Sequence, residues 1–186
     1  MTIEAIELLE TTPCLRQYAD LDWIAYDAAR YGRLDVIRYI NNKDPQHLRY
    51  QGLDLRYTAI SGAQLEVLSY LRDEIKLDFS TSVLYWATEL SSHVEEVFNF
   101  ILLQLGDAAR EPDMLMDVFR EAAREGRIEL VGLLLDAARK FEIQLDTEDA
   151  LQVASQSGVV DRSVKELLVN KLGLYPHLPV DIEAVH

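Results

Sequence analysis

Cysteine, proline and glycine are all scarce in this sequence. The single cysteine, Cys14, excludes an intramolecular disulfide and any Cys-x-x-Cys pair for zinc or redox chemistry. Five prolines and eight glycines among 186 residues leave little material for hairpin turns or long flexible linkers. We therefore expect helices joined by short loops, in a protein of a reducing, cytoplasmic environment.

Long hydrophobic runs and positive charge are scarce as well. The apolar runs are far shorter than the roughly 20 residues of a membrane-spanning helix, and the first residues, MTIEAIELLE, carry glutamates where a secretory signal carries lysine or arginine. We expect neither a membrane span nor a secretory signal. The sequence has 18 Lys and Arg against 32 Asp and Glu, which gives a net charge of −14. Because this charge repels phosphate groups, we expect no direct binding of nucleic acid.

A recurring pattern is the main signal. Residues 28–40 read AARYGRLDVIRYI and residues 122–135 read AAREGRIELVGLLL, and weaker copies begin at Ala59, with Ala63 in place of the glycine, and at Ala154. The first aliphatic residues after the turn are separated by 31, 63 and 32 residues, so a further copy with slipped spacing is expected near residues 83–103. These aliphatic residues are Leu34, Leu65, Ile128 and Val160.

Each copy predicts a helix, a tight turn and a second helix. The paired alanines allow close helix packing, and Gly32 and Gly126 stand where a helix end favours a left-handed backbone. Beyond the turn, aliphatic residues recur at helical spacing. Because one such hairpin cannot bury its own apolar face, the copies should stack. The sequence therefore predicts an all-α solenoid of about five stacked helix-turn-helix repeats.

Residues 28–40 and 122–134 resemble the core of the ankyrin repeat family, A-A-x-x-G-[HN]-[LI]-[ED]-[VI]-[VI]-x-[LY]-[LI]. Residues 59–71 match it in part, and 87–102 and 154–168 match it poorly. Arginine stands where the family has histidine or asparagine, and the family's T-P-L-H and G-A-D-[VI]-N motifs are missing. The resemblance implies an ankyrin-like array, with β-hairpin fingers that are reduced or absent.

The chain organisation follows from these repeats. We expect an N-terminal capping helix in residues 1–19, an ankyrin-like repeat domain in 20–172 and an irregular C-terminal tail in 173–186, where two prolines fall close together. We expect a monomer. Worn repeats of this kind look like those of some bacterial and viral proteins that act inside host cells, although we read no delivery signal here.

No pattern in the sequence predicts catalysis, a metal or a cofactor. Metalloprotease, EF-hand, phosphate-loop and dinucleotide motifs are all missing, and Cys14 has no histidine in its register. Asp146 with Asp149 could be an acid–base pair, but Thr147-Glu148-Asp149 is more typical of a helix start. The C-terminal tail has side chains able to bind a metal, but a solvated tail is the favoured interpretation. Those tail residues are His177, Asp181, Glu183 and His186.

The ankyrin resemblance implies a partner-binding surface on the concave side, made of the first helices and adjoining loops. The predicted contact residues there are Arg30, Tyr31, Ser61, Arg124, Glu125 and Gln156. Trp23, Tyr26 and Trp86, expected near the starts of first helices, either anchor a partner or bridge adjacent repeats. The recurring arginines around each turn either pair with neighbouring acids or receive an anionic group.

The predicted function is a protein–protein interaction module that binds a partner protein through the concave face and catalyses nothing. The alternative is an acidic decoy or inhibitor that blocks a basic surface, such as that of a nucleic-acid-binding protein. The acidic charge fits either hypothesis, because it also serves to keep an exposed helical surface soluble.

Overall fold

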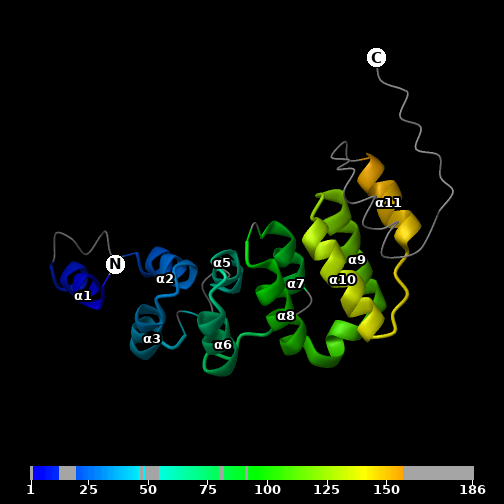
Figure 1. Ribbon diagram of the computed structural model, residues 1–186. Helices are drawn as coiled ribbons and strands as arrows, with labels where there is room; N and C mark the ends of the chain where they lie inside the picture. Colours follow the sequence, from blue (N-terminus) through cyan, green and yellow to red (C-terminus); the bar gives the residue numbers. More distant parts are fainter. Residues whose placement is uncertain are drawn as a thin grey trace, which may run out of the picture. The chain divides into compact units, whose positions relative to one another are not determined.

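The structure, a computed structural model, describes residues 2–12, 20–46, 48, 55–79, 82–90 and 92–156. Most of these residues lie in helices and none of them lies in a β-strand, which confirms the all-α prediction (Figure 1). None of the described helices is long and apolar enough to span a bilayer. The expected tail at 173–186 and Cys14 both lie outside the described residues.

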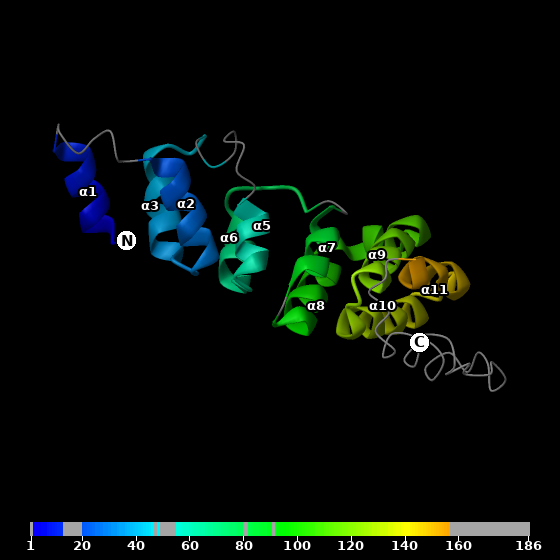
Figure 2. The ribbon, with the colours of Figure 1, turned by 90° about the horizontal axis from the view of Figure 1, so that it is seen from above.

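The chain divides into two compact units, residues 1–111 and 112–186. In the first unit, α2, α5 and α7 are the first helices of hairpins, and they pack side by side in chain order (Figures 1 and 2). The second helices are α3, α6 and α8. The elements are α1 (Ile3–Thr11), α2 (Leu21–Arg30), α3 (Leu34–Lys43), α5 (Leu55–Ser61), α6 (Leu65–Asp73), α7 (Ser82–Trp86), η2 (Ala87–Glu89), α8 (Val94–Leu105) and η3 (Gly106–Arg110).

Helix α2 shows how the sequence sets the ends and the faces of a first helix. The Asp20 carboxylate caps its start by accepting hydrogen bonds from the N–H groups of Asp22 and Trp23, at 3.0 and 3.3 Å. One face, built of Ile24 and three alanines, is buried, and the alanines Ala28 and Ala29 leave room for close packing by α5. The opposite face is free to carry large exposed side chains.

The turns between helices lie where the glycine pattern predicts them. Gly32, Ala63 and Gly126 have φ values of +70°, +53° and +68°. In each turn the residue after the left-handed position donates its N–H to a carbonyl of the preceding helix. The acceptors are the carbonyls of Ala28, Ala59 and Ala122, and each of the three hydrogen bonds is 2.8 Å long. Before α8 the left-handed residue is His93, directly at the helix start, which accounts for the slipped spacing of this copy.

The second helices supply much of the core of the first unit. Their aliphatic faces are buried in the predicted 3.6-residue pattern. Helix α1, which lies within the expected capping segment, contacts α3 and buries Ile6 completely. The buried residues of the second helices include Val36, Ile37 and Ile40 of α3, Val67, Leu68 and Leu71 of α6, and Val97, Phe98 and Ile101 of α8.

The second unit contains α9 (Pro112–Arg124), α10 (Ile128–Lys140) and α11 (Thr147–Gln156). Helix α9 packs against both α10 and α11. The predicted helix start at Thr147 is confirmed, because the Asp146 carboxylate accepts the N–H of Asp149 at 3.0 Å.

Two neighbouring positions in the second turn should respond in opposite directions to substitution. Ala63→Gly removes a side chain from a left-handed backbone and should raise the free energy of unfolding by up to about 1 kcal/mol. Gly62→Ala should lower it by about 1–3 kcal/mol, because the new Cβ would overlap the backbone carbonyl oxygen of Arg30 in α2. Denaturant midpoints of both variants check this, and a shift of the same sign in both would contradict it.

Candidate functional site

Two pairs of aromatic side chains meet on the first helices of the first unit, and we call these four residues the aromatic strip. They are Trp23 and Tyr26 of α2, Tyr57 of α5 and Trp86 of α7. The rings of Trp23 and Tyr26 meet edge to face with centroids 5.8 Å apart, and those of Tyr57 and Trp86 do the same at 5.7 Å. Since the three helices pack side by side, the two pairs lie on neighbouring helices.

The strip combines packing with exposure. Trp23 is 63% exposed, whereas the other three rings are half-buried. Trp86 bridges two hairpins: it contacts Tyr57, and the Arg56 guanidinium lies 5.6 Å from its ring centroid. Trp23 contacts only a ring of its own helix among these aromatics. The bridging interpretation therefore applies to Trp86, while the exposed ring of Trp23 makes no bridge to the other rings of the strip.

One expectation about Trp86 is wrong. The residue was expected near the start of a first helix, but it is the last residue of α7. The chain tightens directly after it into the 3₁₀ turn η2, which is closed by a hydrogen bond from the Leu90 N–H to the Ala87 carbonyl at 3.3 Å. The first helix of this hairpin is therefore shorter than α2, and Trp86 stands at its far end.

Tyr57 is absent from the residues predicted from the sequence. Its hydroxyl donates a 2.6 Å hydrogen bond to the Glu89 carboxylate, and this bond raises the pKa of Tyr57, with burial adding to the effect. The sequence does carry a signal for it. Tyr57 precedes Ala63 by the same interval by which Tyr26 precedes Gly32, so both tyrosines hold one position of the repeat.

The recurring arginines separate into two groups. Arg33 donates two hydrogen bonds to Asp35, at 3.1 and 2.9 Å, which lowers the pKa of that carboxyl group. Arg124 bonds to Glu121 and lies 3.4 Å from Glu125. These two arginines pair with neighbouring acids, as one interpretation expects. Arg30 is exposed, and its side chain makes no ion pair or hydrogen bond within the described part of the chain.

The remaining predicted contact residues fall in both units. Tyr31 is 68% exposed at the end of α2, and Ser61 is exposed at the end of α5, where its hydroxyl donates to the Tyr57 carbonyl at 2.9 Å. Glu125 is exposed in the second unit. Gln156 is the last residue of α11, and its side chain lies outside the described residues. Within the first unit, the structure places the predicted residues on or beside the aromatic strip.

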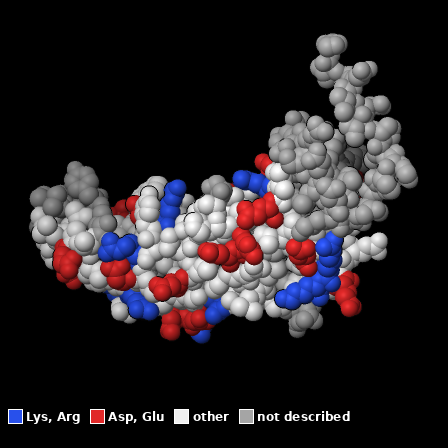
Figure 3. Space-filling model, in the orientation of Figure 1, with Lys and Arg blue, Asp and Glu red and all other residues white. Residues whose placement is uncertain are grey.

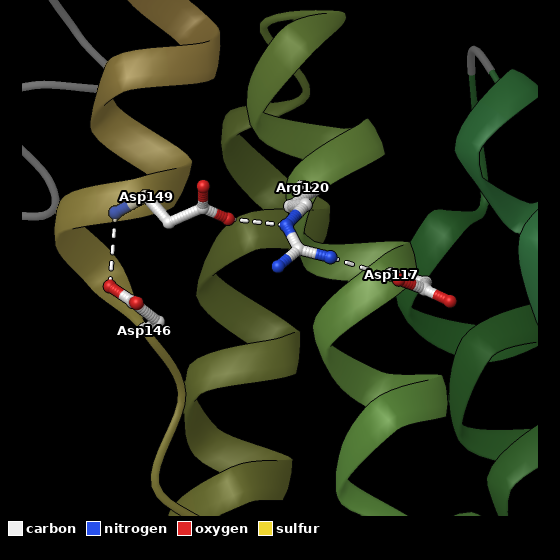
Figure 4. Close-up of polar contacts among 4 residues, drawn as sticks. All are labelled: Asp117, Arg120, Asp146 and Asp149. Atoms are coloured by element: carbon white, nitrogen blue, oxygen red, sulfur yellow. Dashed lines mark hydrogen bonds and ion pairs between the residues drawn. The ribbon is translucent and has the colours of Figure 1, made fainter.

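In the second unit, a charged network links α9 to α11 (Figure 4). The Arg120 guanidinium forms an ion pair with Asp149 of α11 and a second one with Asp117, one turn earlier in α9, at 3.1 Å. Asp149 is held in turn by the Asp146 cap. Asp146 and Asp149 thus serve as a helix cap and an ion-pair partner. Arg120 precedes its turn glycine, Gly126, by the interval that separates Tyr26 from Gly32.

A groove of about 450 Å³ lies on the first hairpin, and we call it the α2 groove. The exposed side chains of Trp23 and Tyr31 line it together with buried apolar residues of α2 and α3. Its complete lining is Asp20, Trp23, Ile24, Asp27, Ala28, Tyr31, Arg33 and Val36.

Charged side chains form small separate groups on the face drawn in Figure 3, with broad uncharged areas between them. On the coloured part of that face, no continuous band of one sign is visible. Within the described residues, no group of three or more histidines, cysteines or carboxylates is placed to hold a metal ion. The acidic and histidine residues of the tail lie outside that part of the chain.

Comparison of the chain with family models, curated proteins and solved structures gives no match in any of the three. The resemblance to ankyrin repeats thus depends on the residues that carry it, chiefly 28–40 and 122–134. The function must be argued from the surface of the molecule.

The Tyr57–Glu89 hydrogen bond should be visible in a pH titration. Glu89→Gln should return the pKa of Tyr57 toward the ordinary value of about 10, because the negative acceptor is lost. Since the folded state raises this pKa, the stabilisation is complete below about pH 10 and is lost as the pH rises through the folded-state pKa. Phenolate absorbance of both proteins, with Tyr57→Phe to assign the signal, measures the shift; identical titrations would contradict it.

The Arg120 network should hold α11 against α9. Arg120→Ala should speed hydrogen exchange of α11 amides by up to about 5-fold, since a partly exposed ion pair contributes up to about 1 kcal/mol. Arg72→Ala is the control, because its ion pair with Asp73 joins neighbouring residues at the end of α6 in the first unit. Exchange rates in α11 that change equally in both variants would show that Arg120 does not link the helices.

Proposed function

We propose that this protein is a protein-interaction module, built as a solenoid of ankyrin-like repeats, that binds a partner protein through the face formed by its first helices. Binding requires no catalytic step. The observation that carries the proposal is the aromatic strip on α2, α5 and α7, flanked by the unpaired and exposed Arg30.

The strip suits binding because its rings are partly fixed before any partner arrives. Aromatic side chains offer a large contact area for few rotatable bonds, and residues of this kind dominate the binding energy of many interfaces. Edge-to-face contacts hold both ring pairs, and the Glu89 carboxylate fixes the Tyr57 hydroxyl. Little side-chain freedom is then lost on association, which favours affinity.

The repetition of one local geometry supports the repeat architecture. The three turns at Gly32, Ala63 and Gly126 share a left-handed residue and the same hydrogen bond of 2.8 Å. In the first unit, successive first helices lie against each other, as stacked repeats require. Tyr26 and Tyr57 hold one repeat position, so the binding surface is itself periodic.

A second candidate function is an acidic decoy that occupies a basic protein surface, and the net charge of −14 favours it. Such a complex would depend on long-range attraction and would weaken steeply as salt is added. On the coloured part of the face in Figure 3 the charges stand in separate groups, which supports recognition by shape and aromatic contacts on that face.

Site-specific photo-crosslinking in native lysate tests the proposal. A photoreactive amino acid at Ser61, exposed beside the strip, should capture a specific partner, whereas the same group at Tyr39 of the second helix α3 should not. Capture from Ser61 that persists at moderate salt supports the interaction module, and capture lost at moderate salt supports the decoy. A partner captured from Tyr39 but not from Ser61 would place binding on the second helices and contradict this proposal.

A further inference from the structure

The α2 groove has an apolar floor and two exposed aromatic walls. Ile24, Ala28 and Val36 form the floor and are buried, while Trp23 and Tyr31 are 63% and 68% exposed. Trp23 lies in α2, and Tyr31 is the residue that caps the end of this helix, about two helical turns further along the chain. Edge contact with Tyr26 fixes the Trp23 ring.

One carboxylate stands between these walls. Asp27 lies four residues after Trp23 and four before Tyr31, so it falls on the same stripe of the helix. It is exposed, lines the groove and makes no ion pair or hydrogen bond through its side chain among the described residues. An acid between two aromatic faces is chemistry that attracts a cation.

The other charged groups of the groove are already engaged. Asp20 uses its carboxylate to cap α2, and Arg33 donates two hydrogen bonds to Asp35. Asp27 is therefore the one charged residue of the lining whose side chain has no hydrogen-bond or ion-pair partner among the described residues. The lining as a whole carries more negative than positive charge.

We propose that the α2 groove binds an arginine side chain of the partner protein, whose guanidinium stacks against Trp23 or Tyr31 and pairs with Asp27. The methylene stem of that arginine lies on the apolar floor. This inference deepens the proposed function and rests on it, because it names the chemistry of one contact made by the interaction module.

Arginine fits this groove better than lysine or an uncharged side chain. Its guanidinium is planar, stacks on aromatic rings and can donate two parallel hydrogen bonds to one carboxylate, whereas an ammonium group is a compact, strongly hydrated charge. A purely apolar side chain would cover the floor but would leave Asp27 desolvated without a partner, which is unfavourable.

A peptide titration tests the inference on the full chain. The probe is a short acetylated peptide of alternating arginine, leucine and alanine, and its matched control carries citrulline, the neutral isostere, at each arginine. In a Trp86→Phe background, Trp23 is the sole tryptophan, so its fluorescence and indole N–H resonance report on the groove. The arginine peptide should change both signals and bind at least about 10-fold more tightly than the citrulline peptide.

Two variants with equal charge change locate the contact. Asp27→Asn should weaken binding of the arginine peptide by about 10-fold, and Glu66→Gln, an exposed acid of α6 outside the groove, by less than about 2-fold. Circular dichroism of both variants checks that the helices persist. Equal weakening in the two would mean that the peptide responds to net charge alone, and the inference would fail.

Further outcomes would also overturn it. Equal binding of the two peptides, or binding that leaves the Trp23 signals unchanged, would exclude an arginine subsite in this groove. A Trp23 signal that changes on dilution without peptide would assign the groove to a second copy of the chain. The photo-crosslink from Ser61 is independent of Asp27, so a captured partner together with a silent groove would refute the arginine subsite and leave the interaction module standing.

Discussion

The left-handed residue in the turn after α2, α5 and α9 is the constraint on which the hairpins depend. At Gly32, Ala63 and Gly126 the chain reverses within a few residues, and one hydrogen bond of 2.8 Å ties the start of the second helix to the carbonyl of the preceding small residue. This turn brings the second helix back against the first, so that the aliphatic faces are buried. Helix propensity alone would not place these faces together.

The sequence allowed the local geometry to be predicted well, because turn and small residues have local causes. Glycine and the alanine pairs place the turns, and aliphatic spacing places the buried faces of α3, α6 and α10. Less could be predicted for the third hairpin, where His93 takes the left-handed position at the helix start. Such a choice depends on packing against neighbours, so Trp86 was expected at the wrong end of its helix.

The candidate site shows the same division between local and non-local causes. Exposed positions such as Tyr31 follow from helical periodicity, whereas the Tyr57–Glu89 bond joins residues of α5 and η2 that are far apart in sequence. The groove over α2 and α3 also depends on how two helices meet. The position six residues before the left-handed residue differs between the copies. It is an aromatic residue in Tyr26 and Tyr57, whereas Arg120 at this position forms an ion pair with α11.

The contact between Gly62 and the carbonyl of Arg30 has a consequence for how this chain tolerates change. Main-chain atoms set the separation of α2 and α5 there, with no side chain between them. The exposed side chains of these helices therefore do not set the distance between the two helices at this point. Substitutions at exposed residues such as Trp23, Asp27 or Ser61 change the side chains that the surface presents and leave the spacing of the two helices as it is. A chain built this way can change the chemistry of its surface by drift, provided that a few glycines and alanines stay in place.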